Sequence, residues 1–117
     1  MKFKINNRQW EIKEVESDFL LKKYKEYDEQ ALYCFGMTKY EIQTIFINKD
    51  MNKEVKKQTL YHELMHCYIW SYANVHSEYT EEELCDLSSN SHDIIHKIVE
   101  EYLVEKAKEN KYEGKNR

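Results

Sequence analysis

The chain has 117 residues and a net charge of −4 at pH 7, and 41% of its residues are hydrophobic. This length suits one compact domain (1–117) that buries a core without disulfide staples. The acidic balance argues against a nucleic-acid partner, because phosphate binding depends on a surplus of basic residues. Three cysteines without CxxC spacing do not form a disulfide framework. With no secretory signal and no apolar stretch of membrane-spanning length, we expect a cytoplasmic (intracellular) protein with no membrane partner.

The first half of the chain, residues 1–50, is predicted to consist mainly of strands. Apolar and polar residues alternate through Lys2–Val15, with an Asn6-Asn7 pair in the middle. This pattern predicts a β-hairpin, since asparagine tolerates the backbone conformations of a tight turn. A short helix should follow, capped by Ser17 or Asp18 and ending near residue 27.

Two further strands are predicted over Ala31–Tyr40 and Ile42–Asn48, which are rich in aromatic and β-branched residues. Gly36 lies inside the first of them and should mark a bulge or a close approach of two backbones. Together with the hairpin, these strands predict a small sheet of antiparallel type.

The second half, residues 53–109, is predicted to be mainly helical, with a tail over 110–117. A helix from about Lys53 to Ala73 is apolar over much of its circumference, which indicates deep burial. A loop over 74–79 should lead to a short helix that begins with a Thr80–Glu83 capping box and ends near residue 88. A last helix, capped by Ser91, should run to about residue 108. Strands followed by helices indicate an α+β fold.

The predicted central helix carries His62-Glu63-Leu64-Met65-His66, an HExxH motif. Residues four apart lie on one face of a helix, so the imidazoles of His62 and His66 can converge on one ion. Glu63 can reach a water on that ion and act as the catalytic base. Neutral nitrogen ligands and an open position suit catalytic Zn²⁺. A polar stripe on an ordinary helix is the weaker alternative.

A catalytic zinc site needs a third protein ligand. A third histidine at the HExxH-xxG-xxH spacing is absent, because Ile69 and Tyr72 hold those positions. The acidic run 81–86 offers a carboxylate instead. Glu82 and Asp86 are four residues apart on one helical face, so Glu82 is predicted to bind zinc and Asp86 to orient a histidine ligand. Glu83 remains the alternative ligand if this register is shifted by one.

Three other histidines lie outside the HExxH motif. His92 and His96 are also four residues apart, and they could form a second metal site or donate to the first. Surface or packing roles are favoured for both, because the segment opens a helix with a clear core stripe. His76, in the predicted loop, could stabilise a transition-state oxyanion or simply be exposed.

The runs 59–66 and 79–86, TLYHELMH and YTEEELCD, resemble small phage-encoded proteins related to the ImmA/IrrE family of metallopeptidases. This resemblance implies a minimal zincin-like (gluzincin-like) fold, in which a small sheet precedes the motif helix, a ligand helix and a C-terminal helix. It also implies zinc as cofactor, with His62, His66 and Glu82 as ligands and Glu63 as base.

These patterns together predict a zinc metallopeptidase, an endopeptidase that acts on a protein or peptide substrate. Glu63 would take a proton from a zinc-bound water and pass it to the leaving amine. The strand over Ile42–Asn48 would hold the substrate backbone by strand addition. The alternative is a non-catalytic, zinc-stabilised protein-binding module of a phage or mobile element.

Overall fold

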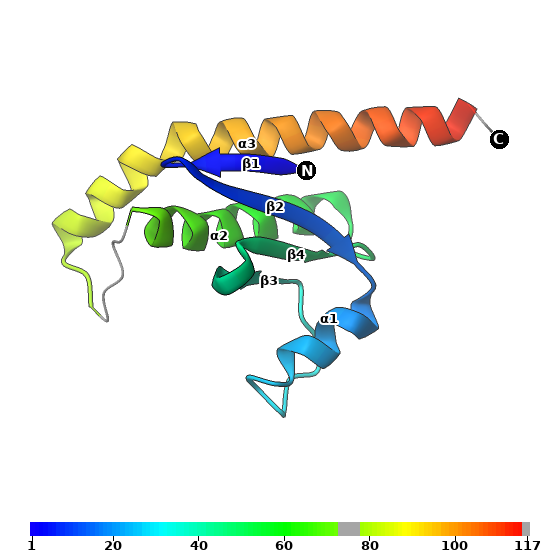
Figure 1. Cartoon of the computed structure of the whole chain (residues 1–117), viewed down its shortest axis with the longest axis horizontal. Coiled ribbons are helices and arrows are strands. Elements are labelled where there is room, and N and C mark those ends of the chain that lie inside the picture. Colours follow the sequence, from blue (N-terminus) through cyan, green and yellow to red (C-terminus); the bar gives the residue numbers. More distant parts are fainter. Residues whose placement is uncertain (73–77, 116–117) are drawn as a thin grey trace.

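The computed structural model describes the backbone of residues 1–72 and 78–115 and the side chains of residues 1–72 and 78–109. The fold is α+β, as expected, with α3 running along one side of the molecule and α1 at the other (Figure 1). No helix in the described part of the chain is long and apolar enough to span a bilayer. The elements in chain order are β1 (Lys2–Ile5), β2 (Arg8–Val15), α1 (Ser17–Tyr24), β3 (Gly36–Lys39), the 3-10 turn η1 (Tyr40–Ile42), β4 (Thr44–Asn48), α2 (Lys53–Ser71) and α3 (Glu81–Lys115).

The N-terminal hairpin forms as predicted. β1 and β2 pair antiparallel, with Phe3 opposite Trp10. Asn6 and Asn7 connect them with positive φ angles of 48° and 65°, the left-handed conformation that a two-residue hairpin turn requires. The side-chain amide of Asn6 donates a hydrogen bond to the backbone carbonyl oxygen of Ser71 at 2.9 Å. The turn is therefore fastened to the end of α2.

The sheet is mixed, with strand order β1-β2-β4-β3. β4 pairs parallel to β2 and antiparallel to β3. The prediction of an antiparallel sheet is therefore wrong at the central pair, because the chain crosses over through α1 before β3 and β4 form. β3 is also shorter than the predicted strand over Ala31–Tyr40. β4 is buried along its whole length and β3 is left at the edge.

Helices cover both faces of the central strand. Ile45 and Ile47 of β4 pack into the main core, which includes residues of α2 and α3 such as Leu64 and Val99. Phe46 points the other way, into a smaller cluster that includes Leu20 of α1. This alternation places α2 directly beneath the sheet.

Two of the three helix starts are capped by side chains. The Asn52 side chain accepts a hydrogen bond from the Val55 amide at 2.9 Å and begins α2. The predicted capping box begins α3, because the Glu83 amide donates to Thr80 Oγ1 and the Thr80 amide donates to Glu83 Oε1. Ser17 does not cap α1. Its hydroxyl lies 2.9 Å from Asn48 Oδ1 and joins the helix to β4.

One continuous helix, α3, replaces the two predicted helices that would break between residues 88 and 91. Leu87, Ser91 and Ile95 are buried at a spacing of four residues, so one core-facing stripe passes through the serine-rich segment. The Ser91 hydroxyl bonds to the Ser88 carbonyl oxygen at 3.4 Å. Core packing therefore outweighs the modest helix preference of serine.

A charge cluster ties β2 to both long helices. The Glu14 side chain is only 14% exposed, and it pairs with Lys56 of α2 at 2.7 Å and with Lys106 of α3. Burial alone would raise the pKa of Glu14, but hydrogen bonds from Lys106 and Lys56 outweigh burial and hold the pKa below its ordinary value. The ionised form of Glu14 therefore stabilises the fold.

We expect Glu14→Gln to lower the free energy of unfolding at pH 7 by about 1–3 kcal/mol, since two lysines lose a charged acceptor. Folding lowers the pKa of Glu14, so the variant and wild type should differ fully in their free energy of unfolding above the unfolded-state pKa of about 4.3. The difference should vanish as the pH falls through the folded-state pKa. Urea unfolding of both proteins between pH 7 and pH 3 measures this difference. Glu16→Gln, at an exposed pair with Lys49, should cost at most about 0.5 kcal/mol. Equal losses in both variants would contradict this assignment.

The expected close approach at Gly36 occurs between β3 and α2. A Cβ atom at this position would lie 2.7 Å from Thr59 Cγ2 and 3.2 Å from Glu63 Cγ. Gly36 has no positive φ, so the requirement here is for space rather than for an unusual backbone conformation. The absence of a side chain allows the edge strand to lie directly on the motif helix.

Gly36→Ala should therefore destabilise the protein by about 1–3 kcal/mol, the usual cost of overpacking. Thr59→Ser removes the Cγ2 atom that the new methyl group would meet. The double variant should regain most of the loss, and urea unfolding of the three variants forms a double-mutant cycle. If the losses in free energy of unfolding of the two single variants simply added in the double variant, β3 would not approach α2 in this way.

Candidate metal centre

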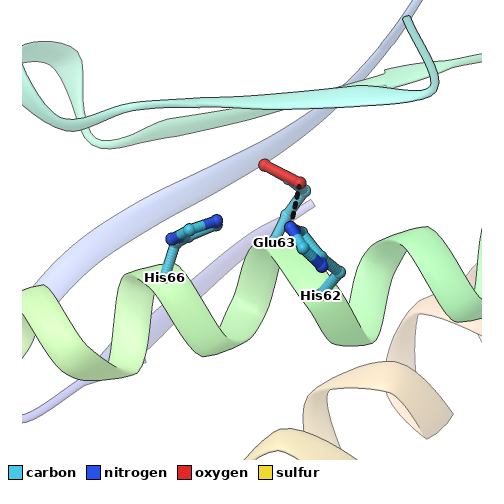
Figure 2. Close-up of side chains that lie close together, drawn as sticks. All are labelled: His62, Glu63 and His66. Atoms are coloured by element: carbon cyan, nitrogen blue, oxygen red, sulfur yellow. Dashed lines mark ion pairs between the residues drawn. The ribbon is translucent and has the colours of Figure 1, made fainter. Parts of the chain in front are cut away.

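The HExxH motif lies in the middle of α2, and its two histidines point away from the face that enters the core. That face is formed by Leu60, Leu64 and Cys67, while His62 and His66 are exposed. The two imidazole rings are one helical turn apart, with centroids separated by 5.0 Å. Figure 2 shows both rings and the Glu63 carboxylate rising from the same side of the helix.

Glu63 is the buried member of the group, with only 6% of its surface exposed. Its Oε1 atom accepts a hydrogen bond of 2.9 Å from the Thr38 hydroxyl of β3. Its Oε2 atom lies 3.8 Å from His62 Nε2 (Figure 2). One carboxylate oxygen is thus held by the edge strand, and the other faces the histidines.

Ligand atoms of His62, Glu63 and His66 all lie within 4.8 Å of one another. Among the described residues, this is the one such group of three or more histidine, cysteine or acidic side chains. Two imidazole nitrogens beside a carboxylate form a donor set of the kind that Zn²⁺ accepts. The side chains therefore fit the ion that the motif predicts.

Two cavities adjoin these residues, and together they are called the cleft. On the β3 side, His62 and Glu63 border a cavity of about 450 Å³, whose other lining residues include Tyr33 and Phe35. On the α3 side, His62 and His66 border a cavity of about 500 Å³, together with apolar residues such as Met65. His62 lines both cavities, so the candidate metal centre lies where they meet.

Thiol and phenol groups near Glu63 remain protonated. Burial raises the pKa of Cys67 far above its ordinary value, and the negative charge of Glu63 adds to this effect. Burial and the same charge also raise the pKa of Cys34. Thiolates are the nucleophilic form of cysteine, so this environment disfavours cysteine chemistry. Burial, together with the negative charge of Glu63, likewise raises the pKa of Tyr40 and keeps its phenol a hydrogen-bond donor.

The predicted ligands on α3 lie away from this group. Glu82 and Asp86 are exposed and do not join it. Glu82 is about two and a half turns before buried Ser91, which places it on the opposite side of the helix. The ligand role of Glu82 and the orienting role of Asp86 stay predictions, and neither side chain lies beside the histidines in this conformation. His76 lies outside the described residues.

Two residues near the group have positions that were not predicted from the sequence. Thr38 was not expected to bond Glu63, because the two are distant in sequence and meet only when β3 packs on α2. His92 lines the α3-side cavity together with His62 and His66, although a surface or packing role was favoured for it. Its spacing of four from His96 was a signal, but the direction of the helical face was not known.

Comparisons of the chain with protein-family models, with curated proteins and with solved structures find no match. The relation to the ImmA/IrrE family therefore stays a prediction that rests on the two motif runs. The chemistry of the centre must be derived from its own side chains, of which His62, Glu63 and His66 are already in place.

Proposed function

We propose that the chain is a zinc-dependent endopeptidase, related to the ImmA/IrrE family, that hydrolyses a peptide bond in an intracellular protein or peptide substrate. The observation that carries the proposal is the convergence of two exposed imidazoles and one buried, oriented carboxylate on a single face of α2. An origin in a phage or other mobile element belongs to the same proposal.

Each side chain of the group has a distinct role in this reaction. His62 and His66 would hold the ion, which, when bound, polarises the scissile carbonyl and lowers the pKa of a coordinated water. The Thr38 hydroxyl fixes Glu63 Oε1. Glu63 Oε2 is then free to take a proton from the attacking water and to deliver it to the nitrogen of the leaving amine.

The substrate backbone would be held at β3. The predicted strand over Ile42–Asn48 cannot add a substrate strand, because β4 is already paired on both sides. β3 pairs only with β4 among the described strands, so its outer edge is available for strand addition beside Glu63. An extended peptide bound there would pass over the two histidines.

A non-catalytic, zinc-stabilised binding module is the second candidate function. It is favoured by one observation: every member of the convergent group comes from α2, with no acid of the run 81–86 among them. In that case the same cleft would hold a protein partner without cleaving it. An open ligand position on the bound ion distinguishes an enzyme from a closed structural site.

We expect the protein to bind about one Zn²⁺ per chain, since the convergent side chains form one site. His62→Ala and His66→Ala should each lose the ion, because either change removes one of two imidazole ligands. Elemental analysis after dialysis against metal-free buffer measures the content. His96→Ala, a change of another exposed histidine, should keep about one equivalent. Full zinc content in both α2 variants would refute the metal centre.

Glu63→Gln should leave folding and zinc content near wild type, because the amide keeps the size of the side chain and still accepts a hydrogen bond from Thr38. Peptide hydrolysis should fall by about 10²–10⁴-fold, the usual contribution of positioned proton transfer. New termini in a proteome-derived peptide mixture, detected by mass spectrometry, provide the assay. Glu54→Gln, at an exposed position of α2, is the matched control. Equal cleavage by both variants would favour the binding module.

A further inference from the structure

We propose that His92 of α3 is the third protein ligand of the metal centre on α2. This inference rests on the proposed zinc site, and it replaces a carboxylate of the acidic run with a third imidazole. The centre would then bridge the two long helices and close the α3 side of the cleft.

The face of α3 that lines the cavity beside α2 carries His92. The α3-side cavity is bordered on α2 by His62 and His66. Its lining from α3 consists of Leu84, Leu87, Ser88, Ser91, His92 and Ile95. Only His92 in that set carries an atom of the usual zinc-ligand types. Glu82 and Asp86 are absent from this wall, as expected from their position on the far side of the helix.

The helical turn that carries His92 is joined to the turn that carries His62 through the neighbouring residues Tyr61 and His96. The Tyr61 hydroxyl lies 2.8 Å from His96 Nδ1 and joins the residue before His62 to the next turn of α3. The His96 ring stacks on the His92 ring, with centroids 5.9 Å apart and planes 6° from parallel. His92 therefore projects from a backbone position that the fold holds opposite the α2 histidines.

The His92 side chain lies at the surface, so its ring can leave the His96 ring and turn toward the ion. It is exposed, and it does not belong to the group whose ligand atoms lie within 4.8 Å. Rotation about its side-chain bonds would carry the ring further into the cavity that it already lines. Loading of the ion would thus draw His92 away from His96 and into the cleft.

Zinc affinity tests the proposal directly, measured by competition with a chromophoric chelator. His92→Ala should weaken binding by about 100-fold or more, because loss of a ligand exceeds the about 10–100-fold effect of losing an outer-shell partner. His96→Ala should cost at most about 10-fold, since that residue only positions the turn. Glu82→Ala should bind zinc like wild type.

A second measurement detects ligation itself. His92→Cys, loaded with Co²⁺, should show a thiolate-to-cobalt charge-transfer band in the near ultraviolet that wild type lacks. His96→Cys is the matched control and should show none, although it places a thiol one turn away on the same helix. A helix-packing role for His92 would not produce the band.

The outcomes separate this inference from the proposed function. Zinc affinity unchanged in His92→Ala but lost in Glu82→Ala overturns the inference and restores the carboxylate ligand, while the peptidase proposal stands. Weakened zinc binding in His92→Ala without the new band in His92→Cys overturns direct ligation. Wild-type protein that binds no zinc overturns both the inference and the proposed function.

Discussion

A carboxylate buried in the middle of a helix is the constraint on which this structure depends. Glu63 has almost no contact with solvent, and an ionised group in that position is costly unless it is hydrogen-bonded. The Thr38 hydroxyl provides the bond, but it can reach only if β3 lies directly on α2. That approach in turn requires Gly36 to have no side chain. The edge strand, the glycine and the carboxylate are therefore one structural unit.

The surroundings of this unit suit the proposed chemistry on long substrates. The His62 side chain is 70% exposed, while Glu63 lies behind it. A polypeptide could meet such a centre along an open cleft, without threading into an enclosed cavity. The Glu14 charge cluster joins β2 to α2 and α3, the two helices that line the α3-side cavity.

The features that could be predicted from sequence are those set by neighbouring residues. The Asn6-Asn7 turn, the Thr80–Glu83 capping box and the HExxH pair all depend on contacts within four positions. Strand order could not be predicted, because insertion of β4 between β2 and β3 depends on residues far apart in the chain. The helical break predicted near Ser91 is absent, because the buried stripe through Leu87, Ser91 and Ile95 continues across that position. In the continuous helix, Glu82 and Asp86 of the acidic run are exposed.

The parallel pairing of β2 with β4 has a consequence for how the protein folds. The β1–β2 and β3–β4 pairs join segments that are close in sequence. The β2–β4 pairing, here called the seam, places Ile12 opposite Ile45 and closes the long loop of chain between them. Non-local pairings form slowly, because loop-closure entropy is lost before their contacts are gained. We expect the seam to form late. Until then, the β3–β4 pair lacks its connection to the N-terminal hairpin, and the contact between Thr38 and Glu63 lacks the support of the complete sheet. The fixed orientation of the Glu63 carboxylate would thus be completed only at a late folding step.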